Sequence, residues 1–289
     1  MALKKVGTNP DRFEKSQIKF YVVLAPFVAF MLLPIIFIFN HAFKPMDALF
    51  AYPPRFFAKQ PTWDNFRNLF RASQISSIPI SRYIFNSVVV TVIVLILSIL
   101  ISTMAAFVLS KKQFRSKKLL LEINNVALMF VATAVTIPRY LIVETLGITD
   151  TVWAHILPLL VMPVGLFLVK QFIDQVPDTL IEAAVIDGAT DWQIYRRIIL
   201  PLIKPAIATL AILSFQTVWN NLETSQLYVN TDSLRTLAFY MNTLASQSNV
   251  VAGQGIAAAA SLIMFVPNLV LFIIFQSNVM NTMSTSGIK

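Results

Sequence analysis

The chain has 289 residues, of which 56% are hydrophobic and only 13% are charged, and its formal net charge is +9. A soluble domain has roughly 25% charged residues, so this sequence cannot cover a water-facing surface and is predicted to lie in a bilayer. The absence of cysteine excludes disulfides and thiolate metal sites. The basic residues flank apolar stretches, which favours topology and headgroup contacts over nucleic-acid binding.

Six apolar segments are long enough, or nearly so, to cross a bilayer as helices, which takes about 20 residues. They are Phe20–Phe39, Ser87–Leu109, Leu119–Ile137, Val152–Val169, Leu202–Trp219 and Ile256–Phe275. The fourth contains Pro158 and Pro163, so we expect a kink there. The sequence therefore predicts an all-α integral membrane protein with six transmembrane helices.

The loop KKQFRSKK at residues 111–118 sets the predicted orientation, because its five basic residues stand without an acid. Cytoplasmic loops carry an excess of Lys and Arg. Basic residues in the first outside loop, between Lys44 and Arg82, weaken this orientation without reversing it. We expect a cytoplasmic N-terminal tail (1–19), a transmembrane permease domain (20–280) and a cytoplasmic C-terminal tail (281–289).

Several kinds of chemistry lack the residues that they need. No charged residue or histidine stands in the middle of any predicted span, which disfavours proton- or ion-coupled transport. No glycine is followed by lysine, so the phosphate-binding loop of an ATPase is missing. His41 and His155 have no metal-ligand spacing partners, and no nucleophile–base pair can be assembled. We expect neither an enzyme nor a metal site, and any pumping must draw its energy from another chain.

A polar stretch, EAAVIDGATDWQIYRRIILP, separates the fourth and fifth spans. Thr179 with Glu182, and Thr190 with Gln193, have the spacing of capping boxes at helix starts. Gly188 lies between them, where a helix end favours a residue that accepts left-handed dihedral angles. The stretch therefore predicts two short helices joined by a turn on the cytoplasmic side.

The same stretch follows a pattern of EAA, three residues, Gly, nine residues and Ile-x-Leu-Pro. It is met by Glu182, Ala183, Ala184, Gly188, Ile198, Leu200 and Pro201. This pattern resembles the coupling-helix signature of the membrane subunits of binding-protein-dependent ABC importers. The segment PTWDNFRNLF, the pairs Asn86-Ser87 and Trp219-Asn220 and the short C-terminal tail, in this order, resemble the carbohydrate-uptake permeases of the maltose-importer type.

The resemblance implies a permease subunit that forms half of the translocation pathway for a sugar or oligosaccharide in a bacterial cytoplasmic membrane. Its implied partners are a second, different permease subunit, two ATPase subunits and an extracytoplasmic solute-binding protein. This chain would hold no cofactor, and ATP and Mg would bind to the ATPase.

The resemblance also implies which residues contact the ATPase. The coupling candidates are Glu182, Ala183, Ala184, Asp187, Gly188, Arg196 and Arg197, with Asp187 also suited to a local cap. The C-terminal tail offers Ser286, Gly287 and Lys289 as further contacts. A frayed tail without a partner is the alternative.

A sugar in transit needs polar side chains and aromatic faces along its path, because its hydroxyl groups cannot be left unpaired. The candidates are Gln216, Trp219, Asn220, Asn221, Asn124 and Asn125. Hydrogen bonding between helices is an alternative role for the asparagines. Ala257–Ser261 is interpreted as helix packing, and Tyr228–Val250 as a polar loop that reaches the binding protein.

Two other functions stay open at this stage. In the first, the chain is a related importer permease whose cargo is an amino acid, a polyamine, phosphate or a metal. In the second, it is a non-transporting membrane scaffold or a channel that works without an ATPase. The basic residues of the first outside loop suit either an acidic oligosaccharide or lipid headgroups. The sequence names neither the sugar nor its charge.

Overall fold

The computed structural model describes residues 17–49, 51–53, 55–75, 78–247 and 251–286, and within these ranges it contains helices and loops without a β-strand. The longer helices are α1 (Ile18–Ala42), α3 (Asp64–Ile75), α4 (Ile80–Lys111), α5 (Lys117–Met129), α6 (Thr136–Thr145), α7 (Trp153–Leu160), α8 (Pro163–Asp174), α9 (Asp178–Ile186), α12 (Lys204–Trp219), α14 (Leu237–Gln247) and α15 (Val251–Ser286). Short helical turns join them: α2 (Met46–Leu49), η2 (Ala132–Val135), α10 (Asp191–Ile194), η3 (Tyr195–Ile199), α11 (Leu200–Leu202), α13 (Glu223–Leu227) and η4 (Asp232–Leu234).

Three of the described helices are long and apolar enough to cross a membrane: α1, α4 and the part of α15 from Gly253 to Gln276. Three further pairs of consecutive helices reach the same length and hydropathy together, but each pair is bent by more than 40°. The described part of the chain thus offers up to six crossings, half of them broken.

The third predicted span, Leu119–Ile137, is not one continuous helix. Helix α5 ends at Met129, Phe130 and Val131 adopt extended backbone angles, and the next helical segment leaves at 109°. Pro138 lies in the first turn of α6, where its missing N–H costs nothing, whereas inside a continuous helix it would clash with the preceding turn. The predicted span therefore corresponds to a bent pair of helices, and the break lies at Phe130 and Val131, ahead of this proline.

The kink predicted in the fourth segment is confirmed. Helices α7 and α8 meet at an angle of 44°, and Pro163 is the first residue of α8. Pro158 lies inside α7 without ending it. Downstream, α12 begins at Lys204 and is bent by 80° from the helical segment Asp191–Leu202.

Helices α4, α8 and α12 pack around the largest buried cluster, which also receives side chains from α10 and η3. Gly165 of α8 lies directly against Leu210 of α12, and a Cβ at this glycine would stand 2.5 Å from Leu210 Cδ1. The missing side chain therefore lets the two helices approach closely. Tyr195 joins the cluster to α4 through a 2.8 Å hydrogen bond between its hydroxyl and Thr103 Oγ1.

The stretch predicted as a polar outside loop, Tyr228–Val250, is partly helical, because it contains η4 and α14. Tyr240 of α14 stacks on Tyr83 of α4 with ring centroids 4.4 Å apart, and α14 also packs on α15. Such aromatic and apolar contacts explain why this stretch folds as a helix. Residues 248–250 lie outside the described part.

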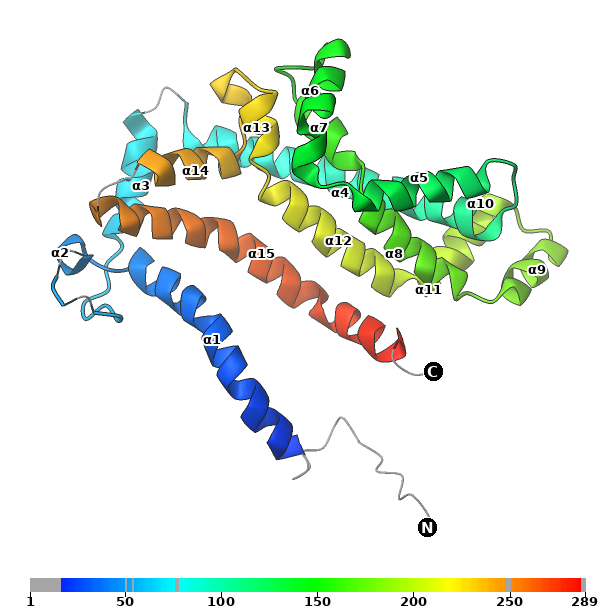
Figure 1. Cartoon of the computed structure of the whole chain (residues 1–289), viewed down its shortest axis with the longest axis horizontal. Helices are drawn as coiled ribbons and strands as arrows, with labels where there is room; N and C mark the ends of the chain where they lie inside the picture. Colours follow the sequence, from blue (N-terminus) through cyan, green and yellow to red (C-terminus); the bar gives the residue numbers. More distant parts are fainter. Residues whose placement is uncertain (1–16, 50, 54, 76–77, 248–250, 287–289) are drawn as a thin grey trace.

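Short helices gather at the two opposite ends of the long axis of the molecule (Figure 1). Helices α2, α3 and α14 gather at one end, where α1 ends and α15 begins, and α9 and α10 lie at the other. Helix α1 packs on α15 and leaves most of its surface exposed. Helix α15 continues to Ser286. The predicted tail at 281–289, which was expected to lie outside the last helix because it is polar, therefore begins within this helix.

Candidate functional site

Helix α9 projects from the end of the molecule at which α4 ends and α5 begins (Figure 1). It starts after Pro177, and no side chain caps its N-terminus. Thr179 is the second helical residue, so its predicted capping box with Glu182 is wrong. Pro177, directly before the helix, and Asp178, in its first turn, mark the start of α9 instead. An acidic side chain in the first turn is stabilised by the helix dipole.

The end of α9 has the hydrogen bonds of a Schellman motif. Gly188 donates to the Val185 carbonyl at 3.0 Å, and Ala189 donates to the Ala184 carbonyl at 2.9 Å. Gly188 has a φ of +78°, as its predicted place between two helices requires. Asp187 occupies the C-cap position, which agrees with its predicted local role.

The second helix, α10, begins with the capping box that the sequence predicts. The Thr190 backbone N–H donates to Gln193 Oε1 at 2.8 Å, and the Gln193 N–H donates to Thr190 Oγ1 at 3.4 Å. Ile194 and Tyr195 follow at once and are buried in the core. On the α9 side, Ile181 and Ala184 are only partly buried against the same core cluster, so the turn is anchored more deeply through α10.

The coupling candidates lie on α9, on the turn that follows it and on η3. Glu182, Ala183, Asp187, Gly188, Arg196 and Arg197 are exposed, and Ala184 is half-buried. Within the described part of the chain, Glu182, Arg196 and Arg197 form no ion pair with another side chain. Their charges are thus available to another molecule.

Ion pairs tie the turn to the basic end of α4. Lys111 Nζ lies 2.7 Å from Asp178 Oδ1 and donates to the Val176 carbonyl at 2.6 Å. Lys112 Nζ lies 2.5 Å from Asp191 Oδ1. These lysines bridge the start of α9 and the start of α10, a role that we did not assign to them from the sequence. The acidic residues between the fourth and fifth predicted spans were the available signal.

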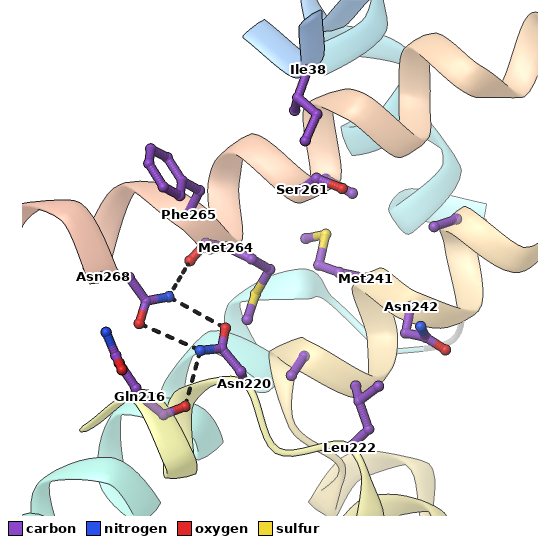
Figure 2. Close-up of a pocket in the computed structure, with 13 residues that line it drawn as sticks. Ile38, Gln216, Asn220, Leu222, Met241, Asn242, Ser261, Met264, Phe265 and Asn268 are labelled. Carbon is purple, nitrogen blue, oxygen red and sulfur yellow. Dashed lines mark hydrogen bonds between the residues drawn. The ribbon is translucent and has the colours of Figure 1, made fainter. Parts of the chain in front are cut away.

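A cavity of about 620 Å³ lies between α12, α14 and α15, close to the end of α1. Two predicted pathway residues, Gln216 and Asn220, line it (Figure 2). Trp219 does not: it is buried, stacks on Phe215, and donates its indole N–H to the Met264 carbonyl at 3.2 Å.

The other predicted pathway residues lie elsewhere. Asn221 Oδ1 accepts the backbone N–H and the hydroxyl of Thr224, in the first turn of α13. Asn124 lines a separate, mostly apolar hollow and donates to the Pro163 carbonyl at 3.5 Å, and Asn125 is exposed on α5. Asn124 thus fits the alternative of hydrogen bonding between helices, whereas Asn221 bonds locally to α13.

Asn242, Ser261 and Asn268 line the cavity, although they were not predicted as site residues. Ser261 closes the small-residue stretch Ala257–Ser261, in which Ala258, Ala259 and Ala260 are buried as expected for helix packing. Ser261 itself lines the cavity, and its hydroxyl donates to the Ala257 carbonyl of its own helix at 2.9 Å. To distinguish the packing residues from the cavity-lining Ser261, one must know which face of α15 lies against α12, and the sequence alone does not give this.

Most of the predicted tail contacts lie outside the described part of the chain. Ser286 is the last residue of α15, and Gly287 and Lys289 lie outside the described residues. Within the described ranges, no group of three His, Asp or Glu side chains is arranged to hold a metal ion. His155 is buried, with its ring nitrogens 2.8 Å from Thr224 Oγ1 and 3.0 Å from the Leu234 carbonyl oxygen.

Comparison with known proteins decides the family. Residues 94–278 match the model of the binding-protein-dependent transport system inner membrane component. The chain belongs to this family. It is a multi-pass membrane protein of the carbohydrate-uptake ABC permease type, and the matched region includes α9, α10 and the residues of α12, α14 and α15 that line the cavity.

Individual relatives agree with this assignment. The chain is 30% identical to the trehalose transport system permease protein SugB of Mycobacterium tuberculosis, over 68% of this chain and 69% of the relative. It is 32% identical to protein LplC of Bacillus subtilis, over 70% and 66%. It is 28% identical to the diacetylchitobiose uptake system permease protein NgcG of Streptomyces coelicolor, over 66% and 62%. The matches thus span about two thirds of each protein.

A solved structure shares the fold. The crystal structure of a bacterial ABC transporter involved in the import of the acidic polysaccharide alginate superposes with a TM-score of 0.77 at 20% identity. The superposition covers 92% of this chain and 98% of that chain. At this identity the likeness establishes the fold alone.

Proposed function

We propose that this chain is the permease subunit of an ATP-driven, binding-protein-dependent importer for a sugar or oligosaccharide. The observation that carries the proposal is α9, a helix that ends in a Schellman motif and presents the unpaired Glu182 at one end of a family member. A rigid, exposed helix with small residues and a fixed charge suits insertion into a groove of an ATPase. Residues 182–184, 187, 188, 196 and 197 form this contact.

The proposed topology has six crossings, with both termini in the cytoplasm. Helices α1, α4 and α15 provide three crossings, and the bent pairs that start at α5, α7 and α10 provide the others. Residues 1–19 and 281–289 flank the permease domain at 20–280 on the cytoplasmic side. The positive-inside rule supports this orientation, because the Lys-rich loop and α9 share one end of the molecule.

The proposed complex contains a second, different permease, two ATPases that bind ATP and Mg, and an extracytoplasmic binding protein. A second solved structure, of a bacterial alginate ABC transporter in complex with an alginate pentasaccharide-bound periplasmic protein, superposes on this chain with a TM-score of 0.53. The names of the relatives, which specify trehalose and diacetylchitobiose, support a saccharide as the cargo. This chain contributes no catalytic residue and no cofactor site.

The test is reconstitution of the complete importer in proteoliposomes with its binding protein. We expect ATP hydrolysis in the partner subunits to rise when the binding protein carries a saccharide, with saccharide uptake in parallel. Stimulation by an amino acid, polyamine or phosphate in place of a saccharide would contradict the cargo. An absence of co-purification with any ATPase would contradict the importer itself.

A further inference from the structure

The cavity between α12, α14 and α15 has a polar lining without a charge. Its hydrogen-bonding side chains are Gln216, Asn220, Asn242, Ser261 and Asn268, and the other lining residues are apolar. Carboxamides and hydroxyls both donate and accept hydrogen bonds, as sugar hydroxyl groups do. An ionised carboxylate, in contrast, only accepts hydrogen bonds, and it carries a charge that this lining, which contains no cation, does not neutralise.

The basic residues that first suggested an acidic cargo do not reach this cavity. Lys44 is buried and donates to the Arg55 carbonyl at 2.5 Å. Arg82 donates to the Ser233 carbonyl at 3.1 Å. Of the six basic residues between Lys44 and Arg82, all of which the structure describes, none lines the cavity.

Arg235, close to the start of α14, is also directed elsewhere. Its guanidinium lies 2.8 Å from Asp232 Oδ1 and stacks 4.6 Å from the centroid of the Phe239 ring. Asp232 therefore neutralises the cation that stands nearest to α14 in sequence. An acidic group inside the cavity has no counter-ion in the described part of this chain.

Two carboxamides close one side of the cavity by bonding to each other. Asn220 Nδ2 lies 3.4 Å from Asn268 Oδ1, and Asn268 Nδ2 lies 3.3 Å from Asn220 Oδ1 (Figure 2). Both distances exceed the usual 2.9–3.0 Å. The bonds of the same amides to their own helices are shorter, at 3.0 Å to the Gln216 carbonyl and 2.9 Å to the Met264 carbonyl.

The two long hydrogen bonds between Asn220 and Asn268 are therefore the ones that a ligand can most easily replace. A hydroxyl group of a ligand can take the place of either amide as donor and acceptor, while each amide keeps its bond to its own helix. Met241, Met264 and Phe265 add apolar surface for the faces of sugar rings. The exchange leaves no polar group without a partner.

We infer that this cavity is a contact site for a neutral saccharide, free of carboxylate and sulfate groups, on the import path. The inference rests on the proposed function, and it restricts the cargo to uncharged sugars. It separates this chain from the alginate importer that shares its fold. Asn220 and Asn268 bind the saccharide from α12 and α15, and Asn242 binds it from α14.

The charge of the cargo is tested with the purified binding protein. It is incubated with neutral oligosaccharides from starch, cellulose and xylan, mixed with oligouronates from pectin and alginate, and the retained ligand is identified by mass spectrometry. We expect a neutral oligosaccharide. Retention of an oligouronate overturns the inference and leaves the proposed function intact, whereas retention of no saccharide defeats the proposed function.

The site is tested by uptake of that retained saccharide into proteoliposomes that contain the complete importer. We expect Asn268→Ala and Asn242→Ala each to lower uptake about fivefold to tenfold, the loss that one hydrogen bond of ordinary strength represents. Basal ATP hydrolysis and co-purification with the ATPases should stay at the parent level, which shows that the variants fold and assemble.

Thr217→Ala and Thr243→Ala are the matched controls. These threonines neighbour Gln216 and Asn242, but their hydroxyls donate to carbonyls of their own helices, at 2.8 Å to Leu213 and 3.0 Å to Phe239. Their uptake should equal that of the parent. Full uptake by both asparagine variants, or an equal loss in the threonine variants, overturns the assignment of the cavity.

Discussion

Glu182 carries its charge on the exposed surface of α9, without an ion-pair partner in the described part of the chain. It lies in the middle of the helix, so its carboxylate does not cap the N-terminus. Glu182→Gln should therefore leave the thermal stability of the isolated permease unchanged, within about 0.5 kcal/mol. We expect weaker co-purification with the ATPase and uptake that falls relative to ATP hydrolysis, because the charge pair that we propose between Glu182 and the ATPase is lost.

Glu122→Gln is the control for this substitution. Glu122 is also an exposed carboxylate, in α5, and its Lys118 partner lies 3.9 Å away. It should keep normal ATPase association. Normal transport by Glu182→Gln would mean that the glutamate of the motif carries no coupling charge.

Asp150 joins the loop before α7 to the chain after α13. Its carboxylate accepts the Thr231 hydroxyl at 2.6 Å and the backbone N–H groups of Thr231 and Asn230 at 2.8 and 3.0 Å. These bonds, above all the one from the Thr231 hydroxyl, hold the pKa of this carboxyl below its usual range. The charged form therefore stabilises the fold above the ordinary pKa of about 3.9, and this stabilisation is lost as the pH falls through the lower folded pKa.

Thermal unfolding in detergent from pH 6 to pH 3 tests this sign. The parent should be more stable than Asp150→Asn at pH 6, and the difference should shrink below about pH 4. A difference that stays constant over this range would show that the carboxylate charge plays no part in joining the loops.

At the scale of elements, sequence signals with a local cause were predictable and those set by packing were not. The Gly188 turn, the Thr190 capping box and the kink at Pro163 each follow from the conformations that one or two residues permit. Asn268 and Asn124 are both asparagines within apolar predicted spans. Only the packing of α15 on α12 places Asn268 in a polar cavity. Helix α14 is likewise fixed by contacts with distant helices.

Lys111 couples three of these elements, since it ends α4, bonds the chain after α8 and pairs with Asp178 of α9. Its side chain is only 7% exposed. Lys111→Met should lower the free energy of unfolding by about 1.5–3 kcal/mol, because it removes charge-assisted hydrogen bonds from the Val176 carbonyl and Asp178. Hydrogen exchange should rise in α9 while the core of α4, α8 and α12 stays protected.

Lys118→Met is the matched control, since the side chain of Lys118 is 90% exposed and its ion pair with Glu122 is 3.9 Å long. Exposed pairs of this kind contribute about 0–1 kcal/mol. A similar loss of stability in both variants would mean that the Lys111 bonds do not hold α9 in place.

Across the whole molecule, the ion pairs of Lys111 and Lys112 link two independent arguments about orientation. The Lys-rich loop is assigned to the cytoplasm by its charge, and α9 by its resemblance to a coupling helix. Because the two lysines contact Asp178 and Asp191, both segments must lie on the same side of the membrane. The orientation of one therefore fixes that of the other.

Reporter fusions determine this orientation directly. A fusion at Lys117 should report the cytoplasm, and a fusion at Ser246, near the end of α14, should report the outside, because α14 lies at the opposite end of the long axis from α9 (Figure 1). A second fusion at Asp187 should agree with Lys117, since ion pairs hold their segments together. The reverse orientation would place α9 outside the cell, away from any ATP, and the proposed coupling would fail with it. Disagreement between Lys117 and Asp187 would instead contradict the packing of α9 against the end of α4.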